Sequence, residues 1–145
     1  MKISKNINNK KNLITNLTEI LAKQLHEYHT KTTVHNYNEV DSLSYEQLPK
    51  ERKNENIIAA KLALDLVYDD FFNNTSKDEI TFSKEKIEKY AEIIHQERIK
   101  RKEKKNAKKW RETQIKPYDK LTEDEKQKDR DQVLLAINLL KQENT

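Results

Sequence analysis

The chain has no glycine and only two prolines among its 145 residues, and this composition limits the folds that it can adopt. Tight hairpin turns and phosphate-binding loops both depend on glycine, because they need positive φ angles or a close approach of the backbone. An α-helix needs neither glycine nor proline, since it satisfies most of its backbone groups internally. The sequence therefore predicts a mostly α-helical fold.

Four segments carry apolar residues at intervals of three and four, the spacing of a helix with one buried face. We predict helices over about residues 13–28, 49–72, 83–110 and 123–142, and we expect residues 1–12 to form a flexible N-terminal segment. The expected buried positions are Leu13, Leu17, Ile20, Leu21, Leu25, Tyr28, Ile57, Ala60, Leu64, Val67, Ala91, Ile94, Ile99, Val133, Ile137 and Leu140.

Local signals mark where these helices begin. Pro49 is compatible with a first helical turn, where its missing N–H has no partner to lose. Ser83 suits an N-cap, and Phe82 and Ile87 flank it in the spacing of a hydrophobic staple. Thr122, three residues before a glutamate, predicts a capping box for the last helix.

Two sequence elements occur twice in the same order. Residues 45–48, Tyr-Glu-Gln-Leu, match residues 118–121, Tyr-Asp-Lys-Leu, at an offset of 73, and residues 21–27 match residues 90–96 at an offset of 69. The first offset also superposes the expected buried faces of the helices that follow, although Ile57 falls on Arg130. The pattern indicates an internal duplication.

A duplication of this kind predicts two helix-loop-helix halves, about residues 13–72 and 80–142, packed about a pseudo-twofold axis. At 145 residues the chain is long enough for one ordinary hydrophobic core. We therefore expect the halves to share that core within a single domain over residues 13–145.

Positive charge is concentrated in one stretch. Residues 1–80 hold eleven basic and twelve acidic side chains, whereas residues 81–145 hold eighteen and thirteen. Residues 98–111 alone contain nine basic residues and one acid. Such a stretch suits phosphate groups or an acidic protein surface, and it is also compatible with a merely solvated helix. The candidate anion or nucleic-acid patch comprises Arg98, Arg101, Lys104, Lys105, Lys108, Lys109 and Arg111.

Composition also excludes several classes of protein. The absence of cysteine excludes disulfides and thiolate metal sites. No apolar run approaches the roughly 18 residues of a membrane span, and the N-terminal stretch has no apolar signal-peptide core. We expect a cytoplasmic protein with no membrane partner, and the Lys, Asn, Ile and Glu content suits a low-GC bacterium or its phage.

The second copy of the repeat resembles the ryanodine-receptor repeat (RyR) domain, which also occurs in bacteria and phages. In that family a helix ending in a His-Glu pair precedes an aromatic segment, a Pro-Tyr-Asp-x-Leu stretch, then Glu, Lys and a Lys-Asp-Arg. The residues that carry the resemblance here are His95, Gln96, Trp110, Pro117, Tyr118, Asp119, Leu121, Glu125, Lys126, Lys128, Asp129 and Arg130, with His26, Glu27, Tyr45, Glu46, Leu48 and Pro49 in the first half.

The RyR resemblance implies a non-enzymatic binding module for a nucleotide-derived ligand. A tyrosine ring can stack on a base, and the following acid can accept hydroxyl or amino protons. The candidate ligand-binding residues are Tyr45, Glu46, Tyr118, Asp119, His26, His95, Trp110 and Arg130. The alternative interpretation is structural: each tyrosine packs over the following helix, and its acid favours the positive end of that helix dipole.

We expect no catalytic residue, metal or cofactor. His26 and His95 lie beside apolar residues and can pair across the pseudo-twofold, but no nucleophile stands at a matched spacing. His26 and His29 have a metal-compatible spacing with His35 nearby, yet no carboxylate has a recognised companion spacing. The main expectation is a phosphate-bearing, nucleotide-like ligand. The alternative is that the basic stretch binds nucleic acid or an acidic host protein.

Overall fold

The computed structural model describes residues 7–32, 43–73, 82–104 and 116–143. These ranges form four α-helices and two single-turn 3-10 helices, with no strand among them. The α-helices are α1 (Ile7–Thr32), α2 (Lys50–Asn73), α3 (Lys84–Lys104) and α4 (Glu123–Glu143). The 3-10 helices are η1 (Tyr45–Gln47), before α2, and η4 (Tyr118–Lys120), before α4. The prediction of a mostly α-helical fold is confirmed.

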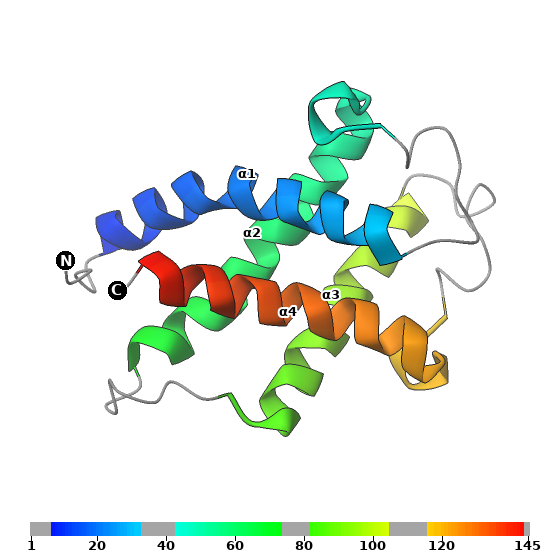
Figure 1. Cartoon of the computed structure of the whole chain (residues 1–145). Helices are drawn as coiled ribbons and strands as arrows, with labels where there is room; N and C mark the ends of the chain where they lie inside the picture. The colour runs from blue at the N-terminus through cyan, green and yellow to red at the C-terminus, as the bar shows by residue number, and fades with distance from the viewer. Residues whose placement is uncertain (1–6, 33–42, 74–81, 105–115, 144–145) are drawn as a thin grey trace.

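The helices form a small bundle in which each helix packs against at least two others. Figure 1 shows α1 and α4 side by side and running in opposite directions, so that the start of α1 and the end of α4 lie at the same end. α2 crosses behind this pair and contacts both of its helices, while α3 packs against α4 and α2. The helices of the two predicted halves therefore share one core.

Small side chains stand where the helices meet. A Cβ methyl group allows two helix axes to approach closely, which brings the larger residues on either side into contact. Leucines, isoleucines and valines from all four helices then complete one buried cluster. The alanines with no exposed surface are Ala22, Ala60, Ala63, Ala91 and Ala136.

The predicted starts of three helices agree with the structure. The backbone N–H of Lys86 donates to Ser83 Oγ at 3.1 Å, and that of Glu125 donates to Thr122 Oγ1 at 3.2 Å. α2 begins at Lys50, directly after Pro49. These cap residues act on the backbone next to them, which is why the sequence alone locates them.

Three predictions for α1 were wrong. The helix begins at Ile7 rather than near Leu13, and Lys10 ties its first turns to α2 through a 3.2 Å ion pair with Asp69. Ile20, expected in the core, is 47% exposed because the buried stripe of α1 is narrower than the apolar pattern implies. Tyr28 also lies at the surface, where its hydroxyl donates to Asp131 of α4 at 2.5 Å.

The repeated elements have matching backbone geometry. η4 and α4 begin 73 residues after η1 and α2, respectively. Leu48 N–H donates to the Tyr45 carbonyl, and Leu121 N–H donates to the Tyr118 carbonyl, both at 3.1 Å. The turn and the helix start are thus the same in both halves, while the pseudo-twofold relation of the whole halves stays a prediction.

Within the described ranges, no helix has both the length and the apolar character needed to cross a membrane.

Candidate functional site

Each half uses one buried histidine to hold its own connecting segment. His26 Nε2 lies 2.6 Å from the carbonyl oxygen of Leu43, and His95 Nε2 lies 2.5 Å from that of Lys116. A carbonyl only accepts, so Nε2 carries the hydrogen and donates it in both cases. The predicted pairing of the two histidines with each other is wrong, because each one bonds within its own half.

The two tyrosines are buried rather than presented to a ligand. Tyr45 is 4% exposed and Tyr118 is 5% exposed. Lys53 and Lys126, one from the first turn of each following helix, place their ammonium groups 5.7 and 5.4 Å from the respective ring centroids. The rings pack beneath α2 and α4, which is the structural interpretation, and neither ring face is open for a base to stack on.

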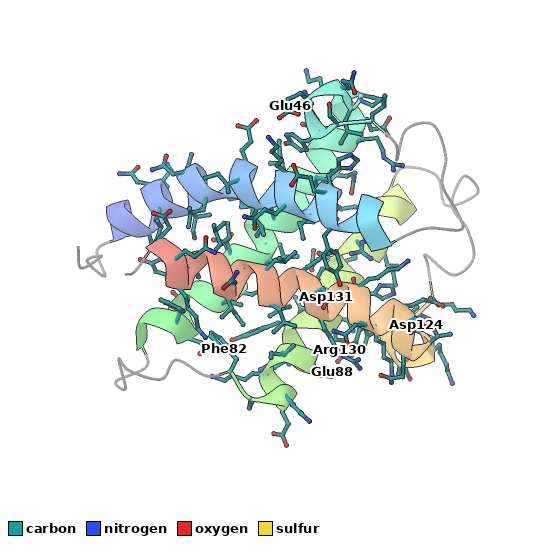
Figure 2. The ribbon with its side chains drawn as sticks, viewed as in Figure 1. Glu46, Phe82, Glu88, Asp124, Arg130 and Asp131 are labelled. Atoms are coloured by element: carbon teal, nitrogen blue, oxygen red, sulfur yellow. The ribbon has the colours of Figure 1, made fainter. Side chains whose placement is uncertain are left out.

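Three side chains of the second half meet at the rim between α3, η4 and α4. Tyr118 donates its hydroxyl to Glu88 Oε1 at 2.5 Å, and Arg130 donates from Nε and Nη2 to both oxygens of Glu88, at 2.7 and 3.0 Å. Arg130 Nη1 also reaches Glu123 at 3.0 Å and Gln127 at 3.2 Å. Figure 2 shows Glu88 and Arg130 next to one another at the crossing of α3 and α4. We call Glu88, Tyr118 and Arg130 the carboxylate clamp.

The carboxylate clamp changes the acidity of all three members. The hydrogen bonds from Arg130 lower the pKa of Glu88, and those same bonds raise the pKa of Arg130. Burial, reinforced by the hydrogen bond to Glu88, raises the pKa of the Tyr118 hydroxyl above its usual value of 10.0. These shifts favour an ionised Glu88, a protonated Arg130 and a neutral Tyr118. Those are the states in which the hydrogen bonds of the clamp can form.

A second polar cluster lies beneath η4. His95 Nδ1 is 3.4 Å from Asp129 Oδ2, and Arg98 Nη2 donates to Asp129 Oδ1 at 2.9 Å. Asp129 is 1% exposed, so its negative charge depends on Arg98 for compensation. The His95 ring faces a carbonyl on one side and this carboxylate on the other. It therefore has no open nitrogen that could act as a base towards a substrate.

The first half keeps the tyrosine, the histidine and a glutamate but lacks the arginine and the aspartate. Ile57 stands at the position of Arg130 and Asn56 at that of Asp129, while Glu19 is the counterpart of Glu88. Tyr45 Oη is buried and has no hydrogen-bond partner among the residues that the structure describes. Burial raises the pKa of Tyr45, with a further contribution from the nearby charge of Glu19. The clamp is therefore incomplete in this half.

The acids next to the tyrosines point outward. Glu46 forms a 3.0 Å ion pair with Lys23 of α1, and its side chain is 63% exposed. Hydrogen bonds from its own backbone N–H and from Lys23 lower its pKa. Asp119 is exposed at the equivalent position of η4. Figure 2 shows Glu46 at the top of the view, away from Glu88 and Arg130 of the clamp.

The predicted basic patch is only partly described. Arg98 is bonded to Asp129, and Arg101 lies 3.3 Å from Glu55 of α2, so the charges of both arginines are neutralised inside the bundle. Lys105, Lys108, Lys109, Trp110 and Arg111 lie outside the described residues, as does the side chain of Lys104. In the part that is described, the arginines of the patch hold helices together.

In the ranges that the structure covers, no three His, Asp or Glu side chains are close enough to hold a metal ion. The side chain of His29 and the whole of His35 lie outside those ranges. Of the predicted metal-compatible histidines, only His26 is described, and its Nε2 is bonded to Leu43.

Glu88 and Glu19 were missed as site residues when the sequence was considered alone. Both stand two residues upstream of the repeat segments 90–96 and 21–27, and they match at the same offset of 69. Extending the repeat alignment in the N-terminal direction would have paired them. The contact of Glu88 with Tyr118 would still not have followed, because it depends on how the helices cross.

Comparison with protein-family models, with curated proteins and with solved structures gives no match to this chain. The resemblance to the RyR domain therefore stays a prediction.

Residues 116–121 form a short segment that two hydrogen bonds attach to α3. His95 of α3 bonds the carbonyl of Lys116, and Tyr118 donates to Glu88 of α3. The charged side chains of this segment are Lys116, Asp119 and Lys120, all of them exposed. We call this the η4 corner.

Proposed function

We propose that this protein is a non-enzymatic binding module of the RyR type that takes up a phosphate-bearing, nucleotide-like ligand at the η4 corner. The observation that carries the proposal is the exposure of Lys116, Asp119 and Lys120 together on a short segment held from beneath. Two ammonium groups suit a phosphate, and a carboxylate between them accepts hydrogen bonds from sugar hydroxyls or base amino groups.

Charges of both signs surround this corner, because the first turn of α4 adds the acids Glu123, Asp124 and Glu125, while the carboxylates beneath it are neutralised. The buried or half-buried carboxylates beneath it, Asp129 and Glu88, are already compensated by Arg98 and Arg130. Their negative charge therefore does little to cancel the exposed lysines. The basic stretch that ends at Arg111 precedes Lys116 by only a few residues in the sequence and adds positive charge to this part of the chain.

A binding role also agrees with the state of the groups that could perform acid–base chemistry. Both nitrogens of His95 face oxygens of the protein, and Glu88 is committed to Arg130 and Tyr118. General acid–base catalysis requires a group within hydrogen-bond reach of a substrate proton. The exposed charges of the η4 corner are suited to recognition instead.

A thermal-shift panel tests the proposal with mono-, di- and cyclic nucleotides and ADP-ribose-type compounds, and with short DNA and RNA. A ligand at about one hundred times its Kd adds about 2.7 kcal/mol to the free energy of unfolding, which raises the Tm by several degrees. We expect a shift with one small nucleotide that is lost in the double variant Lys116→Glu/Lys120→Glu. The matched control is Lys61→Glu, on the exposed face of α2.

The same panel separates the nucleotide from nucleic acid. A response to DNA or RNA alone, falling steeply with salt and unaffected by the η4-corner variant, would assign binding to the basic stretch instead. A nucleotide response that Lys116→Glu/Lys120→Glu leaves intact would place the ligand elsewhere. No response to any of these compounds would contradict the proposal.

A further inference from the structure

The ring of His95 lies between two oxygens that can only accept hydrogen bonds. Nε2 is 2.5 Å from the carbonyl oxygen of Lys116, and Nδ1 is 3.4 Å from Oδ2 of Asp129. A neutral imidazole has one N–H and one lone pair, so it can satisfy only one of these two acceptors. Its other nitrogen then turns a lone pair towards an oxygen.

Burial makes this mismatch costly. The side chain of His95 is 3% exposed and that of Asp129 is 1% exposed, so little solvent reaches the space between them. Nδ1 makes no hydrogen bond to any residue that the structure describes, and a buried polar atom without a partner destabilises a fold. A second proton on the ring removes this cost, because Nδ1 can then donate towards Asp129 while Nε2 keeps its bond to Lys116.

The other charged and titratable groups around this ring have partners of their own. Arg98 donates to Oδ1 of Asp129 at 2.9 Å, which leaves Oδ2 facing His95. Tyr118, whose ring centroid lies 6.1 Å from that of His95, donates its hydroxyl within the carboxylate clamp. Pairs between α2 and α3 are Glu55–Arg101, Asp70–Tyr90 and Asp70–Lys86. Among the described residues, Asp129 is therefore the acid that His95 faces.

We propose that His95 carries two ring protons in the folded protein and acts as a proton-dependent latch on the η4 corner. The doubly protonated ring joins Asp129 of α4 to the Lys116 carbonyl, where the corner begins. When the ring loses one proton, the carboxylate retains the remaining hydrogen, because a bond to a charged acceptor is about twice as strong as one between neutral groups. Nε2 then presents a lone pair to the carbonyl, and this attachment of the corner is lost.

The sign of the pH dependence follows from this chemistry. The latch is closed while the ring holds both protons, and it opens as the pH rises and one proton is released. In its effect on ligands the inference rests on the proposed function, since it makes the nucleotide site at the η4 corner weaker at high pH. His95 is then a positioning residue for that site, acting through the backbone of Lys116.

The first half has the same histidine bond without the aspartate. His26 Nε2 lies 2.6 Å from the Leu43 carbonyl, and Asn56 stands at the position of Asp129. An asparagine amide can offer a donor or an acceptor, so this position is compatible with a neutral histidine. We therefore expect η1 to be insensitive to the rise in pH that opens the η4 corner.

The ring protons can be observed directly by NMR. In ¹⁵N-labelled protein, the two ring nitrogens of a histidine have different ¹⁵N shifts in the doubly protonated ring and in each neutral tautomer. At neutral pH we expect both nitrogens of His95 to be protonated. A ring with its hydrogen on Nε2 alone, in a protein whose Leu121 amide is protected from exchange, would overturn the proposal.

Hydrogen exchange of backbone amides reports whether the corner is held. The N–H groups of Lys120 and Leu121 close η4, and those of Gln47 and Leu48 close η1 in the same way. Between about pH 6 and about pH 9, we expect the protection factors of the η4 amides to fall about tenfold, the effect of losing one hydrogen bond. Those of the η1 amides should change little. Equal changes in both segments would contradict the proposal.

Two variants separate the latch from a purely structural role. Asp129→Asn removes the charged acceptor, so His95 should show one ring proton at neutral pH and η4 should no longer respond to pH. His95→Gln keeps an N–H donor at about the reach of Nε2 but cannot change its charge, so it should also abolish the pH response. The second variant serves even if the first does not fold. A response of η4 that persists in His95→Gln would overturn the proposal.

ADP-ribose separates the latch from the nucleotide proposal. It has no phosphate monoester, the group whose second ionisation falls near neutral pH, so a change in its affinity reports on the protein. We expect its Kd to rise about tenfold from about pH 6 to about pH 9 in the wild type and to stay constant in His95→Gln. A Kd that stays constant in the wild type would contradict the latch. Absence of binding at either pH would contradict only the nucleotide proposal, because ring protons and amide exchange are measured without ligand.

Discussion

In the second half Tyr118 donates to a carboxylate that an arginine also holds, whereas the buried hydroxyl of Tyr45 in the first half has no partner in the described part of the chain. The backbone of the two turns is nevertheless the same, down to the hydrogen bonds that close η1 and η4. The turn geometry therefore does not depend on the clamp. The histidine anchor and the tyrosine ring, which both halves possess, are enough to form it.

The largest effect should come from the buried carboxylate that only the second half contains. Asp129→Asn gives this half the residue that the first half has, and it leaves Arg98 half-buried without its counter-charge. We expect a loss of about 2 to 4 kcal/mol in the free energy of unfolding, measured by urea denaturation. Adding Arg98→Gln should recover part of the loss. If the single variant is as stable as the wild type, the cluster has no structural role.

The second-largest difference in stability between the halves should come from removing the tyrosine hydroxyls. Tyr118→Phe breaks the bond to Glu88 and should lower the free energy of unfolding by about 1 to 2 kcal/mol. Tyr45→Phe removes a buried hydroxyl with no partner and should be neutral or stabilising. Urea denaturation of the two variants measures both changes in the free energy of unfolding. Equal losses would mean that the Tyr45 hydroxyl has a hydrogen-bond partner.

The contribution of Arg130 should depend on pH. Its hydrogen bonds lower the pKa of Glu88, so the stabilisation is present above the ordinary glutamate value of 4.5 and is lost as the pH falls through that value towards the lower pKa of the folded state. Arg130→Ile should cost about 1 kcal/mol at neutral pH, because the Glu88 side chain is 40% exposed and solvent screens the pair. In acid, the free energy of unfolding of the variant should approach that of the wild type. Urea titrations over the acid range test this, and a difference that does not change with pH would contradict it.

The smallest effect should be the same in both halves. Lys53→Met and Lys126→Met each keep an unbranched side chain but remove the charge over a tyrosine ring. At sites that are partly open to solvent, a cation–π contact contributes about 0.5 to 1 kcal/mol. We expect similar small decreases in the Tm of the two variants. Lys126 also lies 4.0 Å from Glu123, so a slightly larger decrease for Lys126→Met would reflect that ion pair. A larger decrease for Lys53→Met would contradict the expectation.

Most of the fold followed from local chemistry in the sequence. Ser83, Thr122 and Pro49 act on the backbone beside them, so the starts of α2, α3 and α4 were predictable within a residue. Ile20 was not, because the three-to-four spacing locates a stripe but does not say how far the neighbouring helices extend across it. The width of a buried face depends on the helices that pack against it.

The polar clusters could not be predicted in the same way. Glu88 and Arg130 are 42 residues apart, and Arg98 and Asp129 are 31 apart. Their contact requires α3 and α4 to cross at one particular register, which packing in the core decides. Repeat alignment identifies equivalent residues between the halves, but it does not say which residues within a half touch.

The histidine anchors also bear on how such a chain can diverge. His26 holds a carbonyl 17 residues downstream, and His95 holds the equivalent carbonyl 21 residues downstream. Both anchors fix the ends of the connecting segment, so the four extra residues fall between fixed points and cost only about 0.2 kcal/mol of loop entropy. Insertions and substitutions can therefore accumulate between the anchors without moving a helix. We expect each connection to tolerate changes in length and sequence while the helices stay in place.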